Sequence, residues 1–250
     1  MEYSYKFRLY PTLAQEAQIQ RTFGCCRYVW NHYLAKRKAI YETDGHTMNY
    51  YECAKDLTSL KKELSWLGEV DAIALQSSIR DLDTGFQNFF RRVKKGEKPG
   101  YPKFKRKKDH RKSYKSKCVG ANIKVVGKYV QLPKLGLVKC RISKEVKGRI
   151  LSATVSQNPS GKYFVSLCCT DVRTDTLPKT GAAIGIDLGL KAFAVASDGT
   201  EYPNHQYLAK SQKKLARLQR QLSRKSKGSK RREKDRIKIA RLYEHISNQR

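Results

Sequence analysis

The chain begins with one strand-like segment and shows no second one until far along its length, which restricts its fold more than any other feature. Tyr3, Tyr5, Phe7 and Leu9 alternate with polar residues, the period of a strand with one buried face. A single strand has no independent stability and must pair with others. We therefore expect the intervening segment to be an insertion between this strand and later strands of one β unit.

The inserted segment has the period of helices. Thr12 and Gln15 have the spacing of a capping box, which predicts a helix start. Apolar spacing predicts helices over residues 12–41, 54–67 and 71–93. The polar side of the last helix carries Gln76, Arg80 and Asn88. These side chains are free to face a nucleic-acid groove, although polar residues on an exposed helix face need no function.

Later in the chain, turn residues separate short strands. Strands are predicted over residues 123–126, 129–132, 137–141, 150–157 and 162–169. Gly127 and the runs Pro133–Gly136 and Asn158–Gly161 supply the turns. Together with the first strand, these segments predict a compact β module with the form of a small barrel. Residues 171–181 are typical of a linker.

The charge of the chain indicates its partner. Lys and Arg number 53 against 22 Asp and Glu, a net charge of +31 that far exceeds what solubility requires. The excess is concentrated in residues 91–117 and 210–250, which contain 14 and 16 Lys and Arg. Such density predicts a nucleic acid bound through its phosphates. A membrane is disfavoured and a cytoplasmic location expected, because the chain lacks a spanning apolar run and a signal-peptide pattern at Met1.

Thirteen cations in these segments are the predicted phosphate contacts. They are Arg91, Arg92, Lys94, Lys95, Lys103, Lys105, Arg106, Lys107, Lys213, Lys214, Arg217, Arg220 and Arg224. Tyr101, Phe104 and Tyr114 lie among the cations of the first segment. Such aromatic residues either stack on bases or anchor the loop, and the sequence leaves both possibilities open.

The cysteines point away from metal binding and disulfides. There are seven, an odd number, and no two have C-x-x-C spacing. We expect them to be reduced and mostly buried as small hydrophobic residues. No zinc is therefore expected in this chain, and no oligomeric state is predicted.

One acidic residue is a candidate for chemistry. Asp187 ends an apolar run inside the pattern Gly185–Gly189, followed by the turn pair Asp198–Gly199. A carboxylate buried there would need a cation, and a divalent metal bridging it to a phosphate would supply one. Alternatively, Asp187 only caps a hairpin turn. A phosphate-binding hairpin of the actin-like ATPases is a third possibility, but those proteins follow the glycine with Thr or Ser, whereas Leu190 stands here.

Seven short motifs follow one another along most of the chain: Phe7–Thr12, Arg27–Asn31, Ala74–Gln76, Phe89–Arg91, Lys98–Phe104, Leu132–Gly136 and Gly185–Gly189. In this order they resemble the motifs of the TnpB family, the transposon-encoded OrfB transposases related to type V CRISPR effectors. The resemblance implies an RNA-guided DNA endonuclease whose partners are a guide RNA and a target DNA. It also implies a multidomain α+β fold. The expected parts are a wedge-type β-barrel (1–10 and 118–178), a helical recognition lobe with a basic loop (11–117), and a partial RuvC-like, RNase H-like nuclease domain (179–250).

The resemblance also assigns roles to single residues. Asp187 corresponds to the first RuvC carboxylate, and Mg²⁺ is its expected metal. Tyr50 and Gln76 match positions that approach the flanking DNA motif, and the helices after residue 207 resemble the bridging helix and the segment that follows it. The family's second catalytic Glu, zinc ribbon and third acidic residue have no counterpart before Arg250. We therefore expect this chain to be inactive as a nuclease by itself. A guided DNA-binding regulator and a decayed transposase fragment are the alternatives, whereas a classical transposase lacks the acids it would need.

Overall fold

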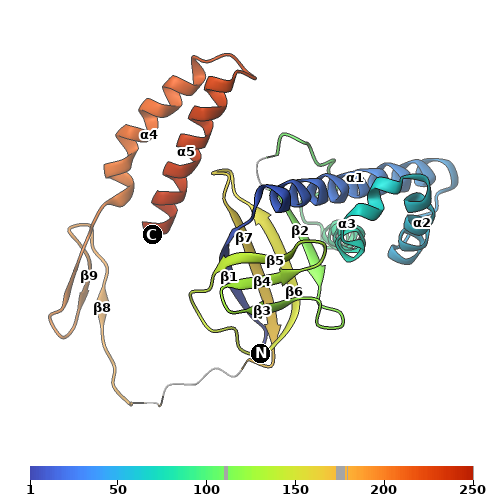
Figure 1. Ribbon diagram of the computed structural model, residues 1–250. Helices are drawn as coiled ribbons and strands as arrows, with labels where there is room; N and C mark the ends of the chain where they lie inside the picture. Colours follow the sequence, from blue (N-terminus) through green and yellow to red (C-terminus); the bar gives the residue numbers. More distant parts are fainter. Residues whose placement is uncertain (110–111, 173–177, 179, 250) are drawn as a thin grey trace. The chain divides into compact units, whose positions relative to one another are not determined.

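The computed structural model describes residues 1–109, 112–172, 178 and 180–249. The chain divides into two compact units, one made of Met1–Asn158 with Lys162–Arg173 and the other of Pro159–Gly161 with Thr174–Arg250. The first unit combines a large sheet with helices, and the second combines a small sheet with a pair of helices (Figure 1). The mixed α+β, multidomain fold is therefore confirmed.

The first unit contains a seven-stranded antiparallel sheet with the order β2-β6-β7-β1-β5-β4-β3. Its strands are β1 (Tyr3–Tyr10), β2 (Lys112–Lys117), β3 (Lys124–Val126), β4 (Tyr129–Leu132), β5 (Gly136–Arg141), β6 (Arg149–Gln157) and β7 (Tyr163–Thr170). Strand β1 pairs with both β7 and β5, so that Phe7 lies opposite Val165 and Leu9 opposite Cys140. The expectation that the first strand joins much later strands, with helices inserted between them, is confirmed.

The sheet curls around an interior that strands near both of its edges share. Val130 and Val138 lie toward the β3 edge, Ala153 and Val155 lie toward the β2 edge, and all four are fully buried in one core cluster. In Figure 1, β5, β4 and β3 cross in front of β6 and β7. No ladder joins β2 to β3 among the described strands. The predicted barrel therefore takes the form of an open barrel.

Strand β2 is the one member of the sheet that the sequence placed elsewhere. Residues up to 117 were expected in the helical block, whereas Lys112–Lys117 pairs along β6. Its Tyr114 and Ser116 are buried, and the lysines between and beside them point outward. Tyr114 thus contributes to the core, where its ring packs edge-on against Phe23.

Three helices and a short 3₁₀ turn form the inserted block. They are α1 (Leu13–Asp44), α2 (Tyr50–Glu63), η1 (Ser65–Glu69) and α3 (Ala72–Lys94). The predicted capping box is present, because Thr12 and Gln15 bond each other reciprocally at the start of α1. The amide of Gln15 also donates to the carbonyls of Leu135 and Leu137, which ties α1 to the sheet. Helix α2 begins four residues before its predicted start, since Asn49 and Glu52 form a second capping box.

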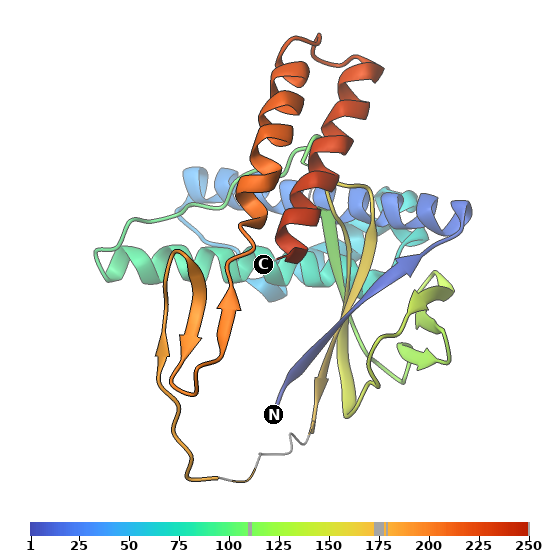
Figure 2. The same cartoon turned by 90° about the vertical axis from the view of Figure 1, so that its left-hand side faces the viewer.

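The second unit contains a three-stranded sheet of order β10-β9-β8 and two helices. The elements are β8 (Ile186–Asp187), β9 (Ala192–Ala196), β10 (Glu201–Pro203), α4 (Tyr207–Ser223) and α5 (Lys230–Gln249). Figure 1 and Figure 2 both show α4 and α5 side by side and antiparallel. The guanidinium of Arg232 closes the hairpin by donating to the carbonyls of Leu222 and Lys225 at the end of α4.

Among the described residues, no helix is both long and apolar enough to span a membrane.

Candidate nucleic-acid interface

The first basic surface is carried by the end of α3 and by residues 95–109, here called the basic loop. Helix α1 holds the backbone of this loop in place. The indole Nε1 of Trp30 donates to the carbonyl of Lys103 over 3.0 Å. The amide of Asn31 bonds Lys105 twice, donating to its carbonyl over 2.9 Å and accepting from its N–H over 2.8 Å. The loop is thus fixed through its main chain, which leaves its charged side chains available for another molecule.

The cations predicted on this surface are exposed. They are Arg91, Arg92, Lys94, Lys95, Lys103, Lys105, Arg106 and Lys107. Those at the end of α3 also complement the negative end of the helix dipole, which is a structural reason for their presence. Lys105 differs from the rest, because its Nζ lies 3.7 Å from the ring centroid of Trp30. Partial burial there lowers the pKa of Lys105, although the charge of Asp81 acts in the opposite direction.

The aromatic residues of the loop have different roles. Tyr101 packs edge-on against Phe86 and Phe89, with ring centroids 5.5 and 5.3 Å away. It therefore anchors the loop to α3. Phe104 exposes 54% of its surface and remains accessible for stacking on a base. Tyr114, the third candidate, is buried in the sheet.

Tyr50 and Gln76 lie on neighbouring helices. Tyr50 begins α2, and the guanidinium of Arg80 on α3 covers its ring at 3.7 Å. Gln76 is exposed on α3 one helical turn before Arg80, so the two side chains share a helix face. The structure thus gives Arg80 a partner within the protein, while a DNA contact by Tyr50 or Gln76 stays a prediction.

The second basic surface lies on the α4–α5 hairpin. The five predicted cations of this segment are all exposed: Lys213, Lys214, Arg217 and Arg220 on α4, and Arg224 at its C-cap. A surface groove joins Lys214 and Leu218 of α4 to Lys238, Arg241 and His245 of α5. The α5 residues were not predicted as contacts, although their helical spacing within the second basic segment was a signal for them. Both helices therefore contribute to this surface.

Asp187 occupies a setting unlike the one expected. A buried carboxylate was expected at this position, but both residues of β8 are exposed, and so are Ile184 and Leu188 beside them. The assumption is wrong because the described residues place no second layer over this strand. The turn itself is tight as predicted, since a Cβ on Gly189 would lie 3.1 Å from the carbonyl oxygen of Ala192.

Asp187 can supply one carboxylate ligand to a metal ion. Its carboxylate is accessible at the end of a strand, as an inner ligand of Mg²⁺ should be. No group of three or more His, Cys, Asp or Glu gathers anywhere in the part of the chain that the structure describes. A two-metal site needs further carboxylates, so Asp187 alone does not make one.

Comparisons with known proteins give the family. Residues 1–46 match the IS605-type OrfB family described as a helix-turn-helix domain, and residues 166–250 match the IS605-type OrfB family described as "Probable transposase". In this structure, residues 1–46 form β1 and the single helix α1. A helix-turn-helix needs two helices, so residues 1–46 do not form the motif after which the first family is named.

Relatives resemble the chain over nearly its whole length. It is 35% identical over 254 residues to a "Putative RNA-guided DNA endonuclease" of Streptomyces pristinaespiralis, covering 99% of this chain and 61% of that protein. It is 34% identical over 247 residues to "Putative RNA-guided DNA endonuclease InsQ" of Escherichia coli (strain K12), covering 98% and 60%. The chain thus spans about three fifths of the length of these relatives. The "Virulence protein VsdF" of Salmonella dublin is 32% identical over 111 residues, which cover 41% of this chain and 91% of that protein.

The fold and the exposed cations define a mixed α+β protein with two strongly basic surfaces. The chain belongs to the TnpB family, the OrfB proteins of IS605-type transposons. Among solved structures, it is similar to "Cryo-EM structure of the Cas12f1-sgRNA-target DNA complex", with 15% identity and a TM-score of 0.32 over 100% of this chain and 66% of that chain. A structural similarity of this size is too low to add to the assignment.

Proposed function

We propose that this chain binds a guide RNA and the DNA that the guide selects, as part of a transposon-encoded RNA-guided DNA endonuclease. The observation that carries the proposal is the anchored basic loop, whose backbone Trp30 and Asn31 hold while its cations remain exposed. The names of the two long relatives support the same activity class. Base pairing with the guide would select the target, and the protein would hold the phosphate backbones.

The electrostatics support binding through phosphates. A net charge of +31 on 250 residues makes binding to a polyanion strongly favourable, and release of condensed counterions makes it depend on salt. Removing one phosphate-binding cation should reduce the slope of log K against log salt by about 0.7 for a single strand and about 0.9 for a duplex. Exposed lysines and arginines on both surfaces would supply these cations.

Asp187 would provide one carboxylate ligand for Mg²⁺. The metal supplies activation of water and stabilisation of the leaving oxygen in hydrolysis of a phosphodiester. The carboxylate at β8 would hold one position on such an ion, and the described residues gather no set of three or more such ligands with it. The proposal for this chain by itself is therefore guided binding, with a contribution to cleavage only within a complete site.

The test is to purify the chain from cells that contain its transposon and to sequence the RNA that copurifies. Recovery of a discrete transcript from the transposon end, followed by binding of DNA complementary to its guide segment, is the expected result. Random cellular RNA, or affinity that does not change with salt, would refute the proposal. Incubation with Mg²⁺ and target DNA is a second measurement. Cleavage that Asp187→Ala abolishes would overturn the restriction to binding.

A further inference from the structure

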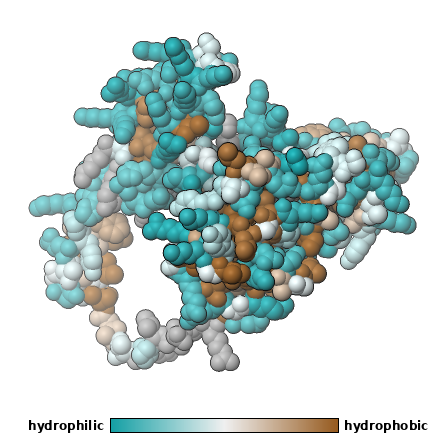
Figure 3. Space-filling model, in the orientation of Figure 1, coloured by the Kyte–Doolittle hydropathy of each residue, from teal (hydrophilic) through white to brown (hydrophobic). Residues whose placement is uncertain are grey.

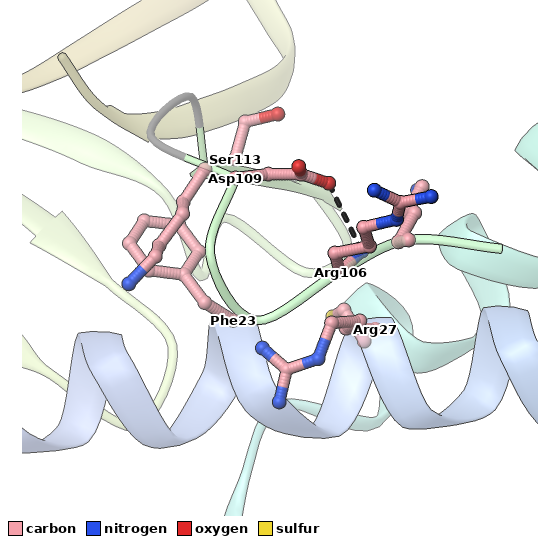
Figure 4. Close-up of a pocket in the computed structure, with 8 residues that line it drawn as sticks. Phe23, Arg27, Arg106, Asp109 and Ser113 are labelled. Atoms are coloured by element: carbon pink, nitrogen blue, oxygen red, sulfur yellow. Dashed lines mark hydrogen bonds between the residues drawn. The ribbon is translucent and has the colours of Figure 1, made fainter. Parts of the chain in front are cut away.

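A small cationic pocket lies in the first unit between α1, the basic loop and the start of β2. Its volume is about 240 Å³, and Arg27, Lys105, Arg106, Asp109, Lys112 and Ser113 line it together with a buried aromatic floor, Phe23 (Figure 4). Pockets for drug-sized ligands have roughly 300–1,000 Å³. This pocket therefore suits a single phosphate group with part of its sugar better than a whole cofactor.

The walls of the pocket are held by bonds within the protein. Arg27 lies one helical turn before Asn31, whose amide clamps the backbone of Lys105. The Nζ of Lys112 donates to the side-chain oxygen of Gln20 over 3.2 Å. Gln20 in turn donates to the side chains of Gln157 and Tyr163 in the sheet. Three segments distant in sequence are thus fixed around one space.

The charge inside the pocket is unbalanced. Arg27, Lys105, Arg106 and Lys112 contribute four cations to its lining, and Asp109 is the one acidic residue there. Figure 4 shows the Asp109 carboxylate directed at the backbone N–H of Arg106, which donates to it over 3.0 Å. That carboxylate therefore closes a turn of the loop, and it offsets only part of the positive charge. An anion in the pocket would balance the rest and gain charge-assisted hydrogen bonds.

We propose that this pocket binds one phosphate of a nucleic-acid backbone where the strand crosses α1, with Arg27 and Lys112 as its principal ligands. The proposal rests on the proposed function, because it takes nucleic acid as the partner. Arg27 offers a planar fork of donors that fits two phosphate oxygens, and Lys112 offers a point charge on the opposite, strand-borne wall. Both lie outside the set of contacts that the sequence alone predicted. The phosphodiester is common to RNA and DNA, and the experiment distinguishes the two.

The experiment measures binding of oligouridine and oligothymidine, each of about 20 nucleotides, by fluorescence anisotropy across a series of salt concentrations. For Arg27→Gln in the full chain we expect roughly tenfold weaker binding and a salt slope smaller by about 0.7, the value for a single strand. Arg27→Lys keeps the charge, so it should retain the slope while losing part of the affinity. The matched control is Lys38→Gln, an exposed cation of α1 that pairs with Glu42 outside the pocket. Unchanged thermal unfolding would show that each variant is folded.

The outcomes separate the pocket from the wider proposal. Equal, small losses for Arg27→Gln and Lys38→Gln would overturn the pocket while leaving salt-dependent binding, and hence the proposed function, in place. Failure of the unmodified chain to bind either oligonucleotide in a salt-dependent way would overturn both. A loss confined to oligouridine assigns the phosphate to RNA, and one confined to oligothymidine assigns it to DNA.

Discussion

The two sheets of this protein both contain apolar residues in their strands but differ in what covers those residues. On β7, Val165 and Leu167 expose none of their surface. Around β8, Ile186 and Leu188 expose 64% and 72%, and Figure 3 shows hydrophobic side chains at the surface along this segment. Strand-forming sequence thus specifies backbone pairing in both sheets. Burial requires a second layer, and only the curled sheet supplies one for itself.

This difference coincides with a division of chemistry. The anchored loop and the cationic pocket are built on the well-packed first unit, where a rigid scaffold holds their donors in place. Asp187, the candidate metal ligand, lies on the sheet with the least buried support. The first unit therefore already holds the phosphate-binding donors in position. A metal site at Asp187, by contrast, depends on further packing against its strand.

The largest expected effect is the difference in stability between two truncations, Leu167→Ala in the first sheet and Ile186→Ala in the second. Leu167→Ala leaves a cavity in the buried interior of the first sheet and should cost about 2–5 kcal/mol of the free energy of unfolding of the first unit. Ile186→Ala removes a side chain that is already in solvent and should change that free energy by less than about 0.5 kcal/mol. Tryptophan fluorescence during urea unfolding reports the first unit, because Trp30 and Trp66 both lie in it. Far-UV circular dichroism in the same titration records the helices and strands of both units and therefore also registers any loss caused by Ile186→Ala. Similar losses for the two variants would end the distinction.

A smaller difference in stability is expected between substitutions of two aspartates, Asp71 and Asp187. Asp71 caps α3 by accepting from the N–H of Ile73, and it also accepts from the buried hydroxyl of Ser116 on β2. Asp71→Ala should therefore cost about 2 kcal/mol in the same unfolding assay. Asp187→Ala should cost nothing measurable there, since Asp187 is exposed on another unit. Asp71→Asn, which keeps the capping oxygen, is the control and should recover most of the loss. A stability unchanged in Asp71→Ala would show that the cap is dispensable.

Much of the architecture was accessible from sequence, for identifiable reasons. The strands from β3 to β7 were predicted within a residue or two of their observed ends, because glycine and proline turns separate them. Strand β2 was not predicted, because its outward lysines, Lys115 and Lys117, belong to a run so basic that it masks the alternation with Tyr114 and Ser116. In that segment the same residues carry both the positive charge and the alternation of a strand, and the charge is the more conspicuous signal.

The site was accessible only in part. Exposure of the predicted cations follows from their charge and needed no structure. The anchoring of the loop by Trp30 and Asn31 could not be derived, because it joins residues more than seventy positions apart through backbone carbonyls. The exposure of Asp187 was predicted wrongly for a related reason. An apolar run shows that a strand is able to be buried, but it does not show whether a covering layer exists.

The smallest predicted effect sharpens the comparison by showing that the second unit is not uniformly unsupported. In its α4–α5 hairpin, Asp235 bonds Lys225 and also pairs with Lys238 over 3.6 Å. The hydrogen bond from Lys225 is the main reason that the pKa of Asp235 lies below its ordinary value. A carboxyl group with a lowered folded-state pKa contributes stability above its unfolded pKa of about 3.9, and this stability disappears as the pH falls through the lower folded value.

Acidification below about pH 4 should therefore increase amide hydrogen exchange in α4 and α5, after correction for the intrinsic rate. Asp235→Asn should exchange faster than the unmodified chain at pH 7 and show a weaker response to acid, because its side chain does not titrate. Peptides from β6 and β7 in the same mass-spectrometry experiment serve as the internal control for general acid unfolding. If the Asn variant and the unmodified chain gave the same exchange across the whole pH series, the Asp235 ion pair would not support the hairpin. The contrast between the packed and unpacked parts of the second unit would then rest on the Arg232 contacts alone.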